Sequence, residues 1–223
     1  MGQISLRRRL EPSLQVEIYE ARLDDEFLMS SLFTAAETEL ATRALAALAG
    51  DELDIVVGGL GLGYTAAAVL ADRRVRALHV VEALDEVIDW HRRDLLPLSE
   101  TLTSDDRCHL VCADFFAAIA ADAPIGDTPQ LFHAILVDID HSPCRHLDPT
   151  HAGFYTRDGL RQVSFRLHAG GVFGLWSDDP PDTSFLEVLD DVFASASAHV
   201  VTFPNPYTGG NSSSTVYLAH AAG

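Results

Sequence analysis

The chain contains no lysine, and all 15 of its strongly basic side chains are arginines. This absence excludes reactions that need a lysine Schiff base, and it excludes phosphate-binding loops of the Walker type. Cysteine is also scarce, with three residues at positions 108, 112 and 144 and no C-x-x-C pair. An odd number of scattered cysteines does not predict a disulfide framework, so we expect reduced thiols and a cytoplasmic location.

Long apolar segments are missing as well. No run approaches the roughly 20 apolar residues of a membrane-spanning helix, and no apolar stretch follows Arg7-Arg8-Arg9 as it would in a secretory signal. We therefore expect no membrane partner. The formal net charge is −18 at pH 7. This acidity disfavours nucleic acid as a partner, because binding depends on neutralising phosphates. It is compatible with a cationic small substrate such as a polyamine, or with a role in solubility alone.

Strand and helix patterns alternate along most of the chain. Apolar–polar alternation predicts a strand at 14–21 and another at 26–32 after a turn at Asp24-Asp25, followed by a helix at 34–48. Further strands are expected at 53–58, 76–82, 107–112, 132–138, 171–176, 199–203 and 215–219. Helices are expected at 63–72, 84–94, 114–121, 156–168 and 183–196.

This alternation predicts the fold class and the domain organisation. Residues 1–50 are expected to form a short N-terminal β-hairpin and a helix, and residues 51–223 a Rossmann-like nucleoside-binding catalytic domain. The domain is α/β, with a mostly parallel seven-stranded sheet covered on both faces. Its last two strands follow each other without a helix, which predicts an antiparallel terminal hairpin. Such a sheet is typical of S-adenosylmethionine-dependent transferases.

The most informative segment is Asp54-Ile-Val-Val-Gly-Gly-Leu-Gly-Leu-Gly-Tyr64. It passes from an expected strand into an expected helix through four glycines, which are Gly58, Gly59, Gly61 and Gly63. Glycine is required there because the turn needs unusual dihedral angles and a ligand must approach the backbone closely. The next strand ends in Glu82, where a carboxylate is placed to accept hydrogen bonds from ribose hydroxyls. The order of these elements predicts a nucleoside-binding site.

Acidic residues also follow the third and fourth strands of this domain. Asp114 can accept a hydrogen bond from an adenine amino group while Phe115 packs on the ring, or it can cap the next helix. The fourth strand delivers Asp138, Asp140 and His141 to the sheet edge where ligands bind. Strand alternation places both aspartates on one face, where they can bind a cationic amine and one can act as its base. The alternative is that Asp140 only caps the loop.

The loop after the fourth strand is rich in residues that can bind metals. They are Asp138, Asp140, His141, Cys144, His146, Asp148 and His151. Their spacing matches no closed structural metal site, so we expect no metal. The segment continues to Phe154 and Tyr155, and a long loop with aromatic residues beside a site predicts a lid over the acceptor pocket. The alternative is a rigid connector that packs on the sheet.

Together, the glycine turn, Glu82, Asp114 and the Asp138 loop resemble the spermidine and spermine synthases. These polyamine aminopropyltransferases share their catalytic fold with S-adenosylmethionine-dependent methyltransferases, and the resemblance covers roughly residues 50–220. It implies transfer of an aminopropyl group from decarboxylated S-adenosylmethionine to an amine, with release of methylthioadenosine. Glu82 would hold the ribose, Asp114 the adenine, and Asp138 would act as general base, assisted by Asp140 or His141. A homodimer is implied by the resemblance only.

The chain departs from that family in three places. The family's glycine loop usually reads GGGDGG, and Gly61 replaces the aspartate that disfavours the carboxylate of ordinary S-adenosylmethionine. In the loop after the fourth strand, His141 stands where the family has a second acid. The family's tyrosine–histidine–glutamate motif for the amine is missing near residues 29–33, although Glu37 can partly substitute.

Three functional hypotheses remain open. The first is an aminopropyltransferase or close relative that acts on an amine. The second is a methyltransferase that uses intact S-adenosylmethionine, because Gly61 leaves no repelling charge. The third is a non-catalytic relative that binds a nucleoside or serves as an assembly partner. Preference for the decarboxylated or the intact donor separates the first two, and binding of neither favours the third.

Overall fold

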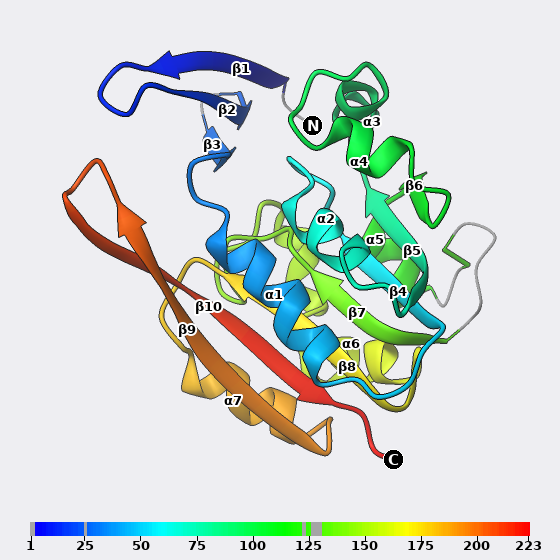
Figure 1. Cartoon of the computed structure of the whole chain (residues 1–223). Coiled ribbons are helices and arrows are strands. Elements are labelled where there is room, and N and C mark those ends of the chain that lie inside the picture. The colour runs from blue at the N-terminus through cyan, green and yellow to red at the C-terminus, as the bar shows by residue number, and fades with distance from the viewer. Residues whose placement is uncertain (1–2, 25, 122–123, 126–130) are drawn as a thin grey trace.

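The chain folds into two β-sheets with helices around the larger one (Figure 1). The computed structural model describes residues 3–24, 26–121, 124–125 and 131–223. Asp25, in the expected N-terminal turn, lies outside these residues. None of the helices in the described part of the chain has the length and apolar character needed to cross a membrane.

The N-terminal sheet is antiparallel and contains three strands where a two-stranded hairpin is expected. In order, the strands are β1 (Ile4–Glu11), β2 (Val16–Leu23) and β3 (Glu26–Ser30). Two arginines of β1 pair with acids on β2: Arg8 with Glu17 at 2.6 Å and Arg9 with Glu20 at 2.8 Å. The arginine run therefore belongs to a strand. Its signal in the sequence is the spacing of the apolar residues at positions 4, 6 and 10.

The larger sheet confirms the expected α/β architecture. Its seven strands are β4 (Leu53–Gly58), β5 (Val75–Glu82), β6 (Cys108–Cys112), β7 (Phe132–Val137), β8 (Leu167–Ser177), β9 (Ser195–Asn205) and β10 (Gly210–His220). They lie in the order β6-β5-β4-β7-β8-β10-β9. Strands β4 to β8 are parallel, and β10 is antiparallel to both β8 and β9. The terminal hairpin thus closes a mostly parallel sheet.

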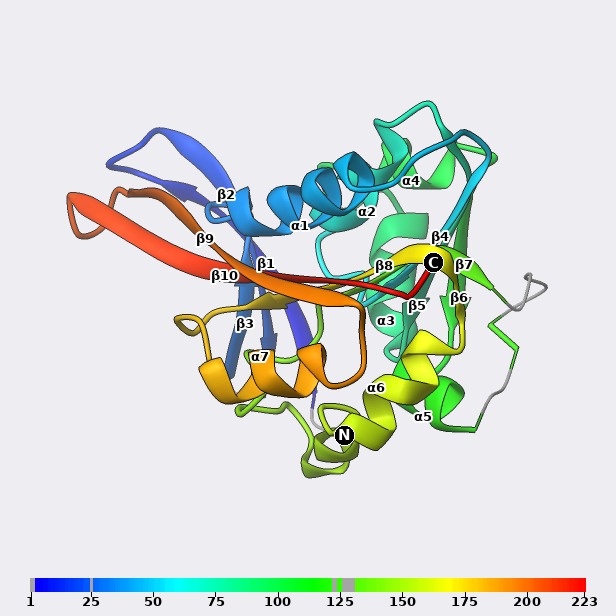
Figure 2. The ribbon, with the colours of Figure 1, turned by 90° about the horizontal axis from the view of Figure 1, so that it is seen from below.

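Helices cover both faces of this sheet, as Figure 2 shows from below. One face carries α1 (Ala35–Ala46), α2 (Tyr64–Leu70), α3 (Asp85–Arg92) and α4 (Ser99–Thr103). The other carries α5 (Phe115–Ala120), the 3₁₀ helix η1 (Pro149–Gly153), α6 (Arg157–Ser164) and α7 (Thr183–Asp190). Buried strands supply apolar side chains to both faces: in β4, Ile55 and Val57 face the first core and Val56 the second.

One helix boundary differs clearly from the sequence-based expectation. A helix over 183–196 is expected, whereas α7 ends at Asp190 and β9 begins at Ser195. Strand β9 pairs with β10 along its whole length, from Ser195 opposite His220 to Asn205 opposite Gly210. The alanines at the start of β9 favour a helix intrinsically, which is why the sequence predicts one, and pairing with a neighbouring strand overrides this preference.

The β9–β10 hairpin reaches beyond the sheet to the N-terminal strands (Figure 1). At its tip, the hydroxyl of Tyr207 accepts a hydrogen bond from Arg9 at 2.9 Å and donates one to Glu11 at 3.2 Å. Next to this contact, the rings of Phe33 and Phe203 lie 5.9 Å apart. The hairpin and the N-terminal sheet are thereby held together near the carboxyl ends of β4 and β7.

Candidate functional site

The glycine turn between β4 and α2 lies directly against the end of β7. Gly59, Gly61 and Gly63 all have positive φ angles, of 95°, 48° and 93°. A Cβ atom on Gly59 would meet the carbonyl oxygen of Asp138 at 2.1 Å, which is far inside contact distance. Glycine is therefore required at position 59 for two reasons: the φ angle is positive, and the backbone at Asp138 leaves no space for a side chain.

Glu82, at the carboxyl end of β5, contacts the same turn. Its carboxylate accepts hydrogen bonds from the backbone N–H of Leu60 and of Leu84, each at 3.0 Å. Burial raises the pKa of Glu82, and backbone N–H donors oppose that rise. The backbone N–H groups of Gly61 and Ala83 also interact with this carboxylate, so the turn and Glu82 hold each other, and the contact of Glu82 with a ribose stays a prediction. The structure brings Glu82 together with the glycine turn, as a nucleoside site requires.

Asp114 and Phe115 follow β6 at the same sheet edge. The Asp114 carboxylate caps α5 by accepting a hydrogen bond from the N–H of Ala117 at 2.9 Å. The capping interpretation is thus observed, and the exposed carboxylate retains further acceptor positions. Phe115 is only 2% exposed. A Cβ atom added to Gly58 would lie 2.8 Å from Cγ of the Phe115 ring, which is too close for an unstrained contact. Phe115 therefore supports the glycine turn from the core, and its contact with a base stays a prediction.

Asp138 lies one residue beyond β7 and faces a second carboxylate, that of Glu37 on α1. The hydroxyl of Thr65, in the first turn of α2, donates a hydrogen bond to Asp138 Oδ2 at 2.6 Å. Burial raises the pKa of Asp138 to about 6. Burial, and then repulsion from Asp138, raise the pKa of Glu37 to about 8. Repulsion between the two carboxylates therefore favours a state in which one of them is protonated, and the ionised one can accept a proton from a ligand.

The expectation that Asp140 shares a face with Asp138 is wrong. Asp140 is 1% exposed and its carboxylate accepts hydrogen bonds from the N–H of Leu147 at 2.7 Å and the hydroxyl of Tyr155 at 2.8 Å. It also pairs with His151 Nδ1 at 2.9 Å. The reason is that β7 ends at Val137, so strand alternation no longer applies. Asp140 holds the following loop and does not reach the Asp138 carboxylate.

The other polar residues of this loop point in separate directions. His141 Nε2 lies 3.2 Å from Glu26 Oε1 on the N-terminal sheet, and Cys144 Sγ lies 3.2 Å from Asp182 Oδ2. Arg145 pairs with Asp179 at 2.9 Å and Asp178 at 3.3 Å. Within the described ranges, no group of three or more histidine, cysteine or carboxylate side chains is arranged to hold a metal ion.

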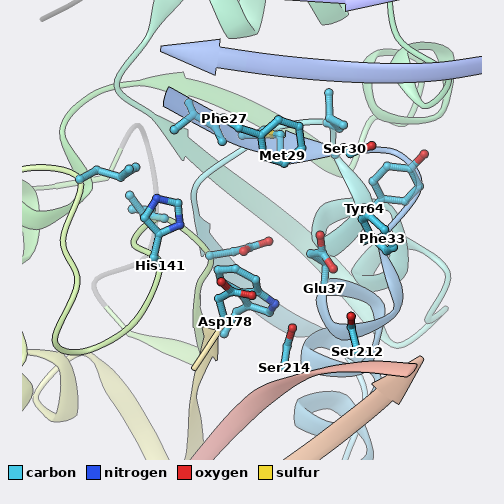
Figure 3. A pocket seen from close by; sticks show the side chains of 18 of the residues that line it. Phe27, Met29, Ser30, Phe33, Glu37, Tyr64, His141, Asp178, Ser212 and Ser214 are labelled. Atoms are coloured by element: carbon cyan, nitrogen blue, oxygen red, sulfur yellow. The ribbon is translucent and has the colours of Figure 1, made fainter. Parts of the chain in front are cut away.

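A cavity of about 490 Å³ opens between the glycine turn, the N-terminal sheet and the β9–β10 hairpin (Figure 3). Glu37 points into it from α1, while Ser212 and Ser214 face it from β10. The loop after β7 contributes His141, Arg145 and Leu147 to the wall of this cavity. Its aromatic residues Phe154 and Tyr155 are buried in the core on the other face of the sheet, so this part of the segment is the rigid connector that was the alternative to a lid. Whether this loop orders on ligand binding stays a prediction.

The structure adds residues that sequence analysis did not find. Thr65 is one of them. The sequence feature that could have indicated it is a polar residue on the buried side of a helix, α2, that is otherwise largely apolar. The second group comes from the hairpin: Phe203, Asn205, Ser212 and Ser214 line the cavity although they follow the glycine turn by more than a hundred residues. No local pattern marks these side chains, because the hairpin's reach over the sheet places them there.

Solved structures of other proteins share this fold. Spermidine synthase from Thermotoga maritima is 18% identical, with a TM-score of 0.72 over 96% of this chain and 68% of that one. A probable spermidine synthase from Corynebacterium glutamicum is 15% identical, with a TM-score of 0.67 over 99% of this chain and 80% of that one.

Human methyltransferase-like protein 13 in complex with SAH is 19% identical, with a TM-score of 0.60 over 83% of this chain and 82% of that one. No protein-family model matches the chain, and no curated protein matches it either. The chain thus has the fold shared by spermidine synthases and a methyltransferase, as the sequence predicts, and at these identities the similarity concerns the fold.

The contact between the glycine turn and β7 predicts a large effect of adding one methyl group. Gly59→Ala should lower the free energy of unfolding by more than about 4 kcal/mol or prevent folding, because the new Cβ overlaps the Asp138 carbonyl. Gly50→Ala is the control, since Gly50 also has a positive φ, of 83°, but open space around it; it should cost about 1–2 kcal/mol. Urea unfolding measures both, and similar costs would contradict the contact.

The Glu37–Asp138 pair predicts a pH-dependent stability. Because both folded-state pKa values are raised, the pair's contribution is fully present below the unfolded values of 4.5 and 3.8 and is lost as pH rises through about 6 and about 8. The thermal midpoint of the ligand-free protein should fall between pH 6 and pH 8.5, and Glu37→Gln should reduce that fall. Glu39→Gln, on the same helix, removes only a half-exposed ion pair with Arg43 and should show the same fall with pH as wild type. Equal falls in all three proteins would contradict the coupling.

Proposed function

We propose that this chain is a transferase that moves an aminopropyl group from decarboxylated S-adenosylmethionine to an amine. The observation that carries the proposal is the Glu37–Asp138 carboxylate pair, which faces a cavity next to the glycine turn. A buried pair of carboxyl groups with raised pKa values can attract an ammonium group and then accept its proton. Spermidine synthase folds, one of them solved with the transition-state analogue AdoDATO, add support from similarity.

The donor would lie across the glycine turn. Glu82 supplies the acceptor positions for the ribose hydroxyls, and Asp114 supplies one for the adenine amino group. The sulfonium end then extends past Gly61 toward the cavity. Glu37 and Asp138 provide negative charge on this side of the turn, which attracts the ammonium group of the decarboxylated donor and repels the carboxylate of the intact one.

The reaction needs one proton transfer and one substitution. Asp138 removes a proton from the acceptor ammonium, and the freed nitrogen lone pair attacks the methylene carbon attached to sulfur. The carbon–nitrogen bond forms as the carbon–sulfur bond breaks, and the sulfur keeps the electron pair and becomes the neutral thioether of methylthioadenosine. Thr65 holds the Asp138 carboxylate in place through its 2.6 Å hydrogen bond. Much of the rate would come from holding nitrogen, carbon and sulfur in line.

A methyltransferase that uses intact S-adenosylmethionine is the second candidate, and one observation favours it. The turn has no carboxylate at position 61, and a Cβ there would lie 2.8 Å from the sulfur of Met29, so a larger residue would have to displace the end of that side chain. The turn itself therefore presents no charge against the carboxylate of the intact donor. The fold of a methyltransferase-like protein solved with SAH is consistent with this alternative.

The general-base assignment predicts that Asp138→Asn lowers turnover by on the order of 10²- to 10⁴-fold, because the amide cannot accept the proton. Methylthioadenosine release from the decarboxylated donor with an amine present measures the rate. The affinity for methylthioadenosine should change by no more than a few-fold. Asp158→Asn is the control, since this exposed aspartate on α6 pairs with Arg161 on the opposite face of the sheet. A fully active Asp138→Asn enzyme would rule out the mechanism.

A further inference from the structure

A second cavity, of about 510 Å³, opens beside α5, η1 and α6. Its lining includes Asp114 and Phe116 at the start of α5, His151 in η1, Phe154 after η1 and Gln162 on α6. None of the residues that line it also lines the cavity beside the glycine turn. The molecule therefore has two separate cavities, and Asp114 belongs to the second one.

A buried carboxylate fixes the orientation of His151. The Asp140 side chain is fully buried and accepts hydrogen bonds from the N–H of Leu147 and the hydroxyl of Tyr155. Its oxygens lie 2.9 and 3.1 Å from His151 Nδ1, so Nδ1 carries the hydrogen and donates it. The ring of Phe116, 4.0 Å from the imidazole, packs against the same side chain.

This arrangement determines what His151 can offer to a ligand. With Nδ1–H bound to Asp140, the neutral imidazole has its lone pair on Nε2, at the opposite side of the ring. His151 lines the cavity and its side chain is 16% exposed, so a ligand can reach it. Nε2 is therefore a hydrogen-bond acceptor held in one orientation.

Asp114 provides a second acceptor in the same cavity. One oxygen of its carboxylate, Oδ1, caps α5, which leaves Oδ2 for a ligand. The side chains of Thr150 and Asp158, which also line the cavity, already have partners in their own segments. The amide of Gln162 can donate or accept. Apart from that amide, the cavity presents acceptors rather than donors to a ligand.

The cavity lies where the base of the proposed donor would end. Cys112 of β6 is the register partner of Glu82 on β5, and Asp114 follows two residues later. Neighbouring strands are about 4.8 Å apart, so a nucleoside whose ribose is held by Glu82 can extend across the end of β6 to Asp114. The donor would then span both cavities, with its base in the second and its sulfonium end toward the first.

Building on the proposed donor site, we infer that His151 determines the specificity for adenine and that Asp140 is its positioning residue. The exocyclic amino group of adenine has two N–H donors and no acceptor. His151 Nε2 accepts one of these hydrogens and the Asp114 carboxylate accepts the other. A base with a carbonyl oxygen at this position places an acceptor against two acceptors, and the site rejects it because those groups are left unpaired.

The test compares two nucleosides that differ at this position. Methylthioadenosine and methylthioinosine, which has a carbonyl group in place of the amino group, are titrated into the full chain by calorimetry. At pH 8.0 an imidazole is ordinarily neutral. We expect methylthioadenosine to bind at least about a hundred-fold more tightly. A ratio below ten-fold, or no binding of either nucleoside, would overturn the inference.

A variant tests the contribution of His151 itself. His151→Phe keeps an aromatic ring beside Phe116 but has no acceptor, so the preference for methylthioadenosine should fall at least ten-fold. His168→Gln is the control, because His168 lies at the start of β8, at the opposite edge of the sheet, and the preference should not change. Equal weakening of both nucleosides in His151→Phe would show a structural role only and would overturn the assignment.

A measurement on the unmodified chain tests the positioning by Asp140, because substituting a buried carboxylate can prevent folding. Nitrogen-15 NMR of histidine-labelled protein should show His151 with Nδ1 protonated and Nε2 bare. Methylthioadenosine should shift the Nε2 resonance, and methylthioinosine should not. The opposite tautomer, or an Nε2 resonance that methylthioadenosine leaves unchanged, would overturn the inference.

Release of methylthioadenosine from the decarboxylated donor tests the transfer function separately. A high preference for methylthioadenosine without any release would uphold the role of His151 and contradict aminopropyl transfer. Release by a protein that binds both nucleosides equally would uphold transfer and contradict the role of His151. The two proposals therefore fail in different ways.

Discussion

The close approach of the glycine turn to the end of β7 determines where every other part of the candidate site lies. The Asp138 N–H donates to the Gly58 carbonyl at 2.8 Å, and the Asp138 carbonyl occupies the space where a side chain at position 59 would be. This backbone contact brings the Asp138 carboxylate beneath the first turn of α2, where Thr65 hydrogen-bonds it. Glu82 on β5 contacts the same turn at Leu60, and Glu37 on α1 lines the cavity beside Asp138, so both carboxylates lie close to this contact.

The two sides have different chemistry. On the side where we propose that the donor binds, Glu82 accepts hydrogen bonds from the backbone amides of Leu60 and Leu84. On the side of the cavity, where we propose that the acceptor binds, Glu37 and Asp138 form a partly buried acidic pair whose pKa values are raised by burial. The N-terminal sheet and the β9–β10 hairpin close this side, and the Arg9–Tyr207–Glu11 contacts hold them together. The acceptor cavity therefore depends on segments at opposite ends of the chain.

The large sheet could be predicted well from the sequence because each of its strands and turns is marked by residues within that same segment. A buried parallel strand such as β4 appears as a β-branched run, and glycines mark the turn after it. It also predicted Glu82 and Asp138 at strand ends, where ligands bind in such sheets. It was wrong about Asp140, because the strand ends at Val137 and the loop then depends on contacts with His151 and Tyr155. Thr65, Phe203 and Ser214 contribute through tertiary contacts, which spacing along one segment does not reveal.

The central claim is that this site binds a sulfonium nucleoside with the charge of the decarboxylated donor. Calorimetric titration with decarboxylated S-adenosylmethionine, intact S-adenosylmethionine and methylthioadenosine tests it most directly, with Glu82→Ala as the variant that should weaken all binding. We expect tight binding of the decarboxylated donor and the thioether and weak binding of the intact donor, because Glu37 and Asp138 repel its carboxylate. Tighter binding of intact S-adenosylmethionine would contradict aminopropyl transfer in favour of methyl transfer, and binding of none of the three would contradict the nucleoside site itself.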